Sequence, residues 1–222
     1  MNSIARMWDC FEEIRCINLP HRTDRWQMAQ DEFRIAGLGD RVKRCDGVLN
    51  RADPAIGCRT AHINVVRQAR ASGLRNVLIF EDDIIFNRQA GDLLASIFEQ
   101  LRIHSDWDLC YLGSYPGYRA GVPVHGEIIG KVSANILEVK RFWGGHAYAI
   151  RSSLYDSILR KEIKYKQIDK LLATDISMEC RTYHVYPPLF SQTSGFSDIQ
   201  GRVVLNQVDT GAFLGEWLGS HD

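Results

Sequence analysis

Long hydrophobic runs and a targeting pattern are both missing from this sequence. No apolar run reaches 18 residues, and the first ten residues mix polar and apolar side chains instead of forming a signal peptide. The last residues do not form a basic or amphipathic segment of the kind that docks on a membrane. We therefore expect a cytoplasmic protein whose contact with a membrane is at most peripheral.

Paired cysteines are missing as well. The chain has six cysteines, but no two of them are spaced as C-x-x-C, and several lie inside apolar runs. This scatter is typical of reduced core residues and favours neither a zinc site nor a disulfide framework. The six are Cys10, Cys16, Cys45, Cys58, Cys110 and Cys180.

An excess of one charge sign is also absent. The 27 basic and 27 acidic residues give a net charge of zero, which argues against a nucleic-acid partner. Arginine is nevertheless preferred over lysine, and arginine presents a planar fork that suits phosphate oxygens. An anionic ligand and an ordinary mixed surface both agree with this composition.

The best-known sequence motifs for phosphate and hydrolytic chemistry do not occur. The chain has no G-x-x-x-x-G-K-[ST] loop, no G-x-G-x-x-G fingerprint, no G-x-S-x-G elbow and no H-E-x-x-H pair. A phosphatase of the Asp-x-Asp type is disfavoured too, because Asp83 is followed by two isoleucines. The class of function that these absences leave open is metal-dependent chemistry on a diphosphate, at an α/β sheet without a P-loop.

The most informative stretch is an apolar strand that ends in three acids. Val77–Phe80 reads as a strand buried on both faces, and Glu81, Asp82 and Asp83 follow it directly. Carboxylates this close repel one another unless a cation neutralises them, and ligands of α/β sheets bind at the carboxyl ends of strands. The stretch therefore indicates either a divalent-metal site or a solvated acidic turn.

Strand-like and helix-like segments alternate along the chain. This order predicts one α/β domain over residues 1–222, with a mostly parallel central sheet flanked by helices. The expected strands are Ile14–Leu19, Val42–Val48, Val77–Phe80, Trp107–Leu112, Ile136–Val139, Phe142–Ile150 and a last one that ends at Val185–Pro188. The expected helices start at Thr23 as N-cap, at Gly57 with Thr60 as N-cap, at Asp92, at Ser152 or Ser153, and at Ile168.

One long irregular segment is expected to carry function or to be disordered. Tyr115–Lys131 is rich in glycine, proline and tyrosine and has no periodicity, so Tyr115 and Tyr118 are candidates for stacking on a base or a sugar. The polar segment from Ser191 to Asp198 reads as a tail. Near the first helix, Arg22 and Arg25 lie where free backbone N–H groups favour an anion.

Taken together, these pieces resemble glycosyltransferase family 25, which includes lipooligosaccharide galactosyltransferases and resembles the glycosyltransferase domain of collagen galactosyltransferases. The matching pieces run in family order from Ile14 to about Asp198. They are Ile17-Asn18-Leu19 with Arg22, Asp24 and Arg25; Gly57-Cys58 with His62; Val77 to Asp83; Gly145-His146-Ala147-Tyr148; Asp169; Pro188-Leu189; Gln192; and Ser197-Asp198.

The resemblance implies a GT-A fold, a nucleotide-sugar donor such as a UDP-hexose, Mn²⁺ or Mg²⁺, and inversion at the anomeric carbon. It implies Asp83 and Glu81 as metal ligands, and Asp169 or Asp175 as the base that receives the acceptor proton. A late histidine, His184 or His221, is a further candidate for the metal shell. The residues expected at the donor are Asn18, Arg22, Arg25, Asp46, His62, Glu81, Asp82, Gly145 and His146.

Two hypotheses of function follow. The first is a metal-dependent inverting glycosyltransferase that moves a hexose, which the resemblance implies is galactose, from UDP to a hydroxyl of a saccharide or glycoconjugate. The alternative is a non-catalytic module that binds a sugar nucleotide or a glycan on the same fold. A metal-dependent phosphohydrolase is a weaker third hypothesis, because the nucleophilic aspartate motif is absent.

Overall fold

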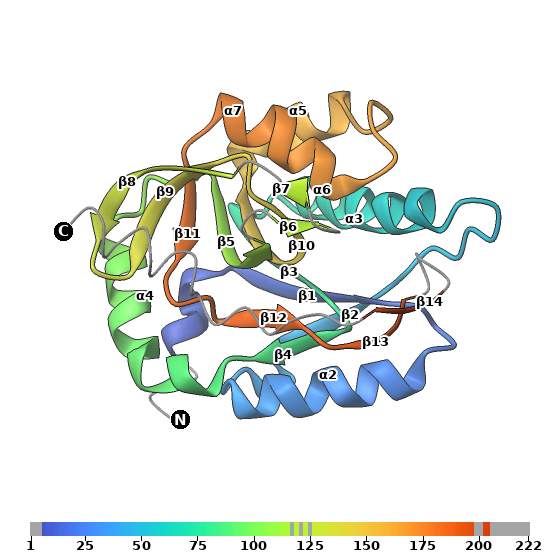
Figure 1. The fold of residues 1–222 in the computed structure, drawn as a ribbon, viewed down its shortest axis with the longest axis horizontal. Coiled ribbons are helices and arrows are strands. Elements are labelled where there is room, and N and C mark those ends of the chain that lie inside the picture. The colour runs from blue at the N-terminus through green and yellow to red at the C-terminus, as the bar shows by residue number, and fades with distance from the viewer. Residues whose placement is uncertain (1–5, 116–117, 120–121, 124–125, 198–201, 205–222) are drawn as a thin grey trace.

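The strand that precedes the three acids lies within an eight-stranded sheet. The computed structural model describes residues 6–115, 118–119, 122–123, 126–197 and 202–204. Helices cover both faces of the sheet, so the chain has the predicted α/β fold (Figure 1). The strand order is β2-β1-β3-β10-β5-β11-β9-β8.

The first half of the sheet is parallel. The strands β1 (Glu13–Asn18), β2 (Val42–Asp46) and β3 (Asn76–Glu81) pair in parallel, with β1 between the other two. Each of the connections between them carries a helix, as expected for parallel neighbours. All three carboxyl ends therefore meet at one edge of the sheet.

The second half is mixed, so the expectation of a mostly parallel sheet was wrong. Strand β10 (Trp143–Arg151) runs antiparallel to both β3 and β5 (Leu109–Tyr115). Strand β11 (Thr182–Val185) is parallel to β5, whereas β9 (Ile136–Lys140) is antiparallel to β11 and to β8 (Glu127–Ser133). Only two residues join β8 to β9, which leaves no room for a crossover helix.

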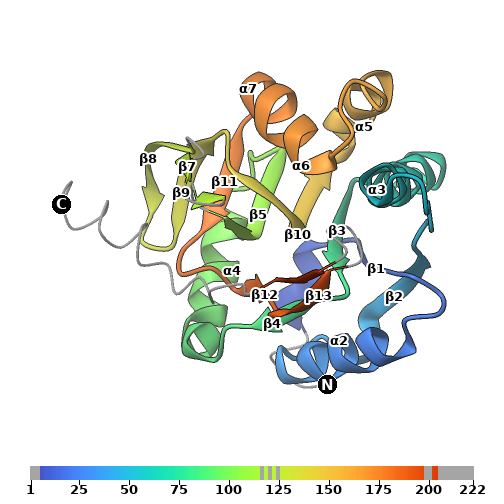
Figure 2. The same ribbon diagram turned by 45° about the vertical axis from the view of Figure 1, so that its right-hand side comes forward.

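Strand β3 is buried on both faces, as its four apolar residues predict. Leu78 and Phe80 belong to the core that also holds side chains of α2 (Thr23–Ile35) and α4 (Leu94–Ile103). Val77 and Ile79 belong to the core on the opposite face, beneath α3 (Pro54–Ala71) and α5 (Ser152–Arg160). Figure 2 shows the two helical layers on either side of the sheet. The alternation of side chains along a strand explains how four successive residues supply two cores.

The beginnings of two helices differ from the prediction. Thr23 was predicted as the N-cap of α2, but it is the first helical residue, and Arg22 occupies the N-cap position. Helix α3 begins at Pro54, and the Thr60 hydroxyl lies inside it, where it donates to the carbonyl oxygen of Ile56 at 2.7 Å. Proline is favoured in the first helical turn because its missing N–H has no partner there, so Pro54 was the better signal.

The segment after β11 was also misread. Residues 190–197 form β12 (Phe190–Gln192) and β13 (Gly195–Ser197) instead of a polar tail. Strand β12 pairs antiparallel with β4 (Ile84–Phe86), and β13 pairs with β14 (Arg202–Val204). A three-residue strand carries too little periodicity to be recognised from sequence.

The irregular segment predicted at Tyr115–Lys131 ends earlier than expected, because β8 begins at Glu127. The stacking role predicted for Tyr115 and Tyr118 concerns side chains outside the described part of the chain.

The remaining elements are short. They are η1 (Trp8–Cys10), η2 (Gly39–Arg41), η3 (Arg88–Leu93), β6 (Tyr118–Arg119), β7 (Val122–Pro123), α6 (Ile168–Leu171), the π-helix η4 (Leu172–Ile176) and α7 (Ser177–Glu179).

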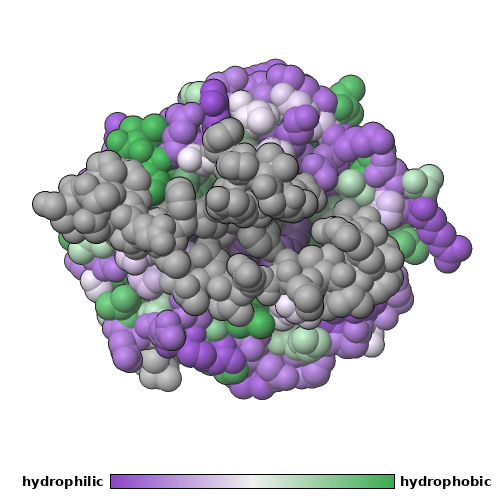
Figure 3. All heavy atoms as spheres, viewed as in Figure 1, coloured by the Kyte–Doolittle hydropathy of each residue, from purple (hydrophilic) through white to green (hydrophobic). Residues whose placement is uncertain are grey.

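The surface of the described residues is mainly hydrophilic in the view of Figure 3, with hydrophobic residues in separate groups. Within the described ranges, every helix is too short or too polar to cross a membrane.

Replacing Phe80 tests the packing of β3 against the core that it shares with α2 and α4. The ring is fully buried and packs against Phe33 and Phe190 at centroid distances of 5.1 and 4.8 Å. We expect Phe80→Ala to lower the free energy of unfolding by about 3–5 kcal/mol, measured by urea denaturation. Met28→Ala, at a side chain that is 53% exposed, should change it by less than about 0.5 kcal/mol. Equal effects of the two substitutions would contradict this packing.

Candidate functional site

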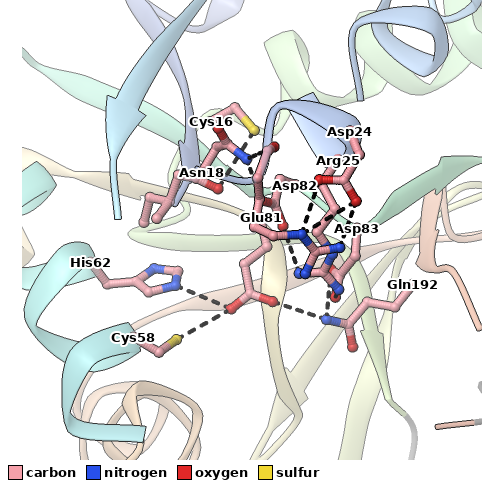
Figure 4. A network of polar contacts seen from close by, with 12 residues as sticks. Cys16, Asn18, Asp24, Arg25, Cys58, His62, Glu81, Asp82, Asp83 and Gln192 are labelled. Atoms are coloured by element: carbon pink, nitrogen blue, oxygen red, sulfur yellow. Dashed lines mark hydrogen bonds and ion pairs between the residues drawn. The ribbon is translucent and has the colours of Figure 1, made fainter. Parts of the chain in front are cut away.

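Three acidic side chains gather where β3 leaves the sheet. Glu81 is the last residue of β3 and pairs with Ile17 of the neighbouring strand β1. Asp82 and Asp83 form the turn into β4. Figure 4 shows their side chains surrounded by residues of β1, α2, α3 and β12. The sequence therefore predicted both the cluster and its place at the carboxyl edge.

Asp82 links helix α2 to strand β1 through hydrogen bonds. Its carboxylate accepts hydrogen bonds from Asn18 Nδ2 at 2.6 Å and from Arg25 Nη1 at 2.9 Å. Asn18 also donates to the backbone carbonyl of Arg22 at 2.9 Å. Burial raises the pKa of Asp82, and the Arg25 guanidinium opposes that rise. Asn18, Arg25 and Asp82, all predicted at the donor site, therefore form one connected group.

Asp83 holds its proton to a higher pH than an ordinary aspartate does. It accepts hydrogen bonds from Arg25 Nη2 and from Gln192 Nε2, each at 3.0 Å. Burial, with the charge of Glu81 next in importance, raises the pKa of Asp83 to about 7. At neutral pH this group therefore gains from any additional positive charge placed beside it.

Glu81 is held on the opposite side of the cluster. Its Oε1 atom lies 3.2 Å from His62 Nε2 and 3.7 Å from Cys58 Sγ, and its Oε2 atom accepts from Gln192 Nε2 at 2.9 Å. Burial works to raise the pKa of Glu81, but the hydrogen bond and charge of His62 outweigh it and leave the pKa below its usual value. Glu81 is therefore the ionised member of the Glu81–Asp83 pair.

Gln192 and Cys58 were not predicted as site residues. One nitrogen of Gln192 donates to both Glu81 and Asp83, so it lies between the two carboxylates (Figure 4). Both residues belonged to the family resemblance, and that was the available signal. The role of Gln192 depends on the pairing of β12 with β4, which the sequence did not reveal.

Gly145 allows a fourth carboxylate to approach. A Cβ atom built on this glycine would lie 2.6 Å from Asp169 Oδ1 and 3.3 Å from Glu81 Oε1. The absence of a side chain on β10 therefore makes room for Asp169, at the start of α6, to face the cluster. Gly145, predicted at the donor, therefore lies against carboxylates of the protein itself.

Asp175 does not share this position. Its carboxylate pairs with Lys164 Nζ at 2.6 Å and accepts from the Tyr165 hydroxyl at 3.0 Å. Burial favours a higher pKa, but the hydrogen bonds from Lys164 and Tyr165 leave the pKa of Asp175 below its ordinary value. These contacts fix the π-helical segment to the loop before it, whereas Asp169 lies beside the cluster.

Three other residues predicted at the donor, Arg22, Asp46 and His146, lie in three different environments. The Arg22 guanidinium is paired with Asp24 at 2.8 Å. Asp46, at the end of β2, lines a separate hollow of about 450 Å³ between β2 and α3. The His146 ring is buried, and burial lowers its pKa to about 4, so it is neutral at pH 7. A ligand contact by His146 stays a prediction.

The late histidines gain no support as metal ligands. His184 is fully buried, its Nε2 lies 2.6 Å from Ser114 Oγ, and its Nδ1 lies 2.7 Å from the carbonyl oxygen of Val185. Both ring nitrogens therefore have protein partners. His221 lies outside the described residues.

The donor set suits a hard divalent cation. Oxygens of Glu81 and Asp83 each lie within 3.0 Å of the Gln192 nitrogen, so both carboxylates point at one position. The raised pKa of Asp83 marks negative charge that the protein does not fully neutralise. If its amide turned over, Gln192 would offer a third oxygen, and carboxylate and amide oxygens are the ligands that Mg²⁺ and Mn²⁺ prefer.

Comparison with known proteins gives one similar curated sequence. The human protein described as "Inactive glycosyltransferase 25 family member 3" is 28% identical over an alignment covering 46% of this chain and 22% of that protein. No family model matches the chain. The chain is thus distantly similar to a glycosyltransferase 25 family protein, which confirms the resemblance. It spans about a fifth of the length of that relative.

Solved structures give broader but weaker similarity. A glycosyltransferase involved in glycosylation of the major capsid of PBCV-1 aligns with a TM-score of 0.45 and 10% identity, over 83% of this chain and 93% of that one. The protein A197 from STIV gives a TM-score of 0.47 and 10% identity, over 88% and 94%.

The raised pKa of Asp83 predicts how stability changes with pH. The folded protein holds a proton on this carboxyl up to about pH 7, whereas the ordinary pKa of an aspartate side chain is 3.8. The stabilisation is therefore complete below about pH 3.8 and is lost as pH rises through about 7. We expect the free energy of unfolding to decrease between pH 5 and pH 8 in wild type, and to decrease less in Asp83→Asn.

Asp24→Asn is the matched control for this experiment. The Arg22 hydrogen bond lowers the pKa of Asp24 to about 2, so this carboxyl is ionised in both states throughout the range from pH 5 to pH 8. The free energy of unfolding of Asp24→Asn should therefore differ from that of wild type by the same amount at every pH between 5 and 8. Urea denaturation at several pH values measures both variants, and parallel curves for wild type and Asp83→Asn would contradict the assignment.

Proposed function

We propose that the chain is a glycosyltransferase that transfers a hexose from a UDP-sugar to a hydroxyl group of a saccharide or glycoconjugate. The observation that carries this proposal is the arrangement of four carboxylates. Glu81 and Asp83 converge on one position beside Arg25, and Asp169 faces the same cluster across Gly145. The distant similarity to a glycosyltransferase 25 family protein agrees with it.

Asp83, Glu81 and Gln192 would hold Mn²⁺ or Mg²⁺ in this proposal. When bound, the cation would neutralise the charge that develops on the diphosphate leaving group. Arg25 now pairs with both Asp82 and Asp83. A cation at Asp83 would weaken the second of these pairs and free one edge of the guanidinium for a phosphate oxygen. Asn18 would keep Asp82 and the start of α2 in place.

Asp169 would be the base of a single inverting displacement. Such a reaction needs one carboxylate that removes the proton from the acceptor hydroxyl, on the side of the sugar opposite to the diphosphate. Asp169 comes from α6, next to Gly145 of β10, and it is partly exposed. Asp175 is the weaker candidate because its carboxylate is already paired with Lys164 and Tyr165.

A non-catalytic sugar-nucleotide or glycan-binding module is the second candidate, and two observations favour it. The similar human protein is described as inactive. In this chain, moreover, the carboxylates that would bind the metal are already in contact with Arg25 and Gln192. Ligand binding without turnover would identify this alternative.

Calorimetric titration tests the donor site. We expect UDP and UDP-galactose to bind only when Mn²⁺ is present, because a cation held by Asp83 and Glu81 would offset the repulsion between these carboxylates and the diphosphate. Asp83→Ala should weaken this binding at least about 100-fold, which corresponds to about 2.7 kcal/mol. Asp24→Ala, at an exposed carboxylate in the first turn of α2, should leave the affinity within about threefold of wild type. Absence of binding with and without Mn²⁺ would rule out the donor site.

A pair of substitutions tests the base. We expect Asp169→Asn to lower kcat by about 100- to 10,000-fold while UDP affinity stays within a few-fold of wild type, since the amide cannot accept the proton. Asp175→Asn should leave kcat unchanged and lower the thermal midpoint, since it weakens the contacts with Lys164 and Tyr165. Release of UDP from a panel of UDP-hexoses and saccharide acceptors is the measurement. The opposite pattern would assign the base to Asp175.

A further inference from the structure

A second group of metal-binding atoms lies beside the acidic cluster. Cys58 Sγ, His62 Nε2 and Glu81 Oε1 all lie within 4.8 Å of one another. Two of the separations, from Glu81 Oε1 to His62 Nε2 and to Cys58 Sγ, are 3.2 and 3.7 Å. Ligands bound at about 2.0–2.3 Å from a tetrahedral ion are about 3.3–3.8 Å apart, so small movements would let these atoms share one ion.

The fold fixes the direction of all three side chains. Cys58 and His62 are four residues apart on α3, so they project from the same face of the helix. Glu81 reaches toward them from the end of β3 (Figure 4). The His62 side chain is fully buried, whereas Cys58 is partly exposed and the Glu81 side chain is 19% exposed. An ion from solution could therefore reach the group from the side of Cys58 and Glu81.

The second nitrogen of His62 has the partner that a metal-binding histidine needs. His62 Nδ1 lies 2.9 Å from the Tyr148 hydroxyl. A tyrosine hydroxyl can donate or accept, so it supports either tautomer of the ring. With the proton on Nδ1, the Nε2 lone pair points at the position between Cys58 and Glu81. Such outer contacts fix the tautomer and orientation of histidine ligands.

The three donors differ in kind from those of the oxygen site. Thiolate and imidazole ligands favour Zn²⁺ and related ions, whereas Mg²⁺ and Mn²⁺ prefer carboxylate and amide oxygens. We propose that Cys58, His62 and Glu81 form a binding site for a thiophilic divalent cation of the Zn²⁺ class. On binding, the Cys58 thiol loses its proton to solvent, and His62 gives up the Nε2 proton that contacts Glu81 in the free protein, keeping a proton on Nδ1 toward Tyr148. The two negative ligands then balance the charge of the ion.

This site shares Glu81 with the oxygen site. An ion held by Cys58 and His62 would draw the Glu81 carboxylate toward α3 and away from Asp83. Zn²⁺ and Mn²⁺ would then compete through one side chain. The competition rests on the proposed function, but the binding of Zn²⁺ by Cys58 and His62 does not.

Co²⁺ titration of the full chain, without nucleotide, tests the proposal. Co²⁺ replaces Zn²⁺ in sites of this kind and gives a near-ultraviolet absorption band when a thiolate binds it. We expect one equivalent of Co²⁺ to produce this band and one equivalent of Zn²⁺ to remove it. Cys58→Ala should abolish the band. His62→Gln should weaken Co²⁺ binding about 10- to 100-fold or more, since even the outer partners of metal ligands are worth that much.

Matched controls separate this site from other thiols and from the donor site. Cys45→Ala and His21→Gln change a partly exposed cysteine and an exposed histidine elsewhere, and both should keep the band. Asp83→Ala should also keep it, even though it removes Mn²⁺-dependent UDP binding. Far-ultraviolet circular dichroism confirms that each variant is folded. Absence of the band in wild type, or its persistence in Cys58→Ala, would overturn the proposal.

Discussion

Repulsion among the carboxylates at the end of β3 is the constraint on which the rest of this site depends. Burial of β3 on both faces places Glu81, Asp82 and Asp83 where water can only partly solvate them. Positive and hydrogen-bonding groups from four other elements offset the repulsion: Asn18 of β1, Arg25 of α2, His62 of α3 and Gln192 of β12. The compensation is uneven, because burial and the neighbouring charge of Glu81 still raise the pKa of Asp83.

The same compensation decides what chemistry the site can perform. Each group that stabilises the carboxylates in the free protein would have to move or be shared when a cation and a diphosphate bind. Arg25 is suited to this because its guanidinium already contacts two carboxylates and can give up one of them. Gln192 is suited as well, because an amide can present either nitrogen or oxygen. A glycosyltransferase and a binding module would differ in how readily these exchanges occur, not in which residues are present.

Glu81 connects two regions with different ligand chemistry. On one side it shares Gln192 with Asp83, and on the other it contacts His62 and Cys58. The cysteines were expected to be reduced core residues, but Cys58 lies beside a buried histidine and a carboxylate. This arrangement arises because Cys58 and His62 are one helical turn apart and α3 packs directly over the sheet beside β3. Neither the spacing nor the helix alone would have predicted the carboxylate.

The sequence by itself determined the local features. These were the buried strand before Glu81, most helices and strands of the α/β fold, and the acidic cluster at a sheet edge, because each depends on periodicity over a few neighbouring residues. Tertiary structure alone decided the antiparallel insertion of β10, the pairing of β12 with β4 and the placement of Asp169 apart from Asp175. Those features depend on contacts between residues that are up to about a hundred positions apart, and no local pattern records which distant segments will pack together.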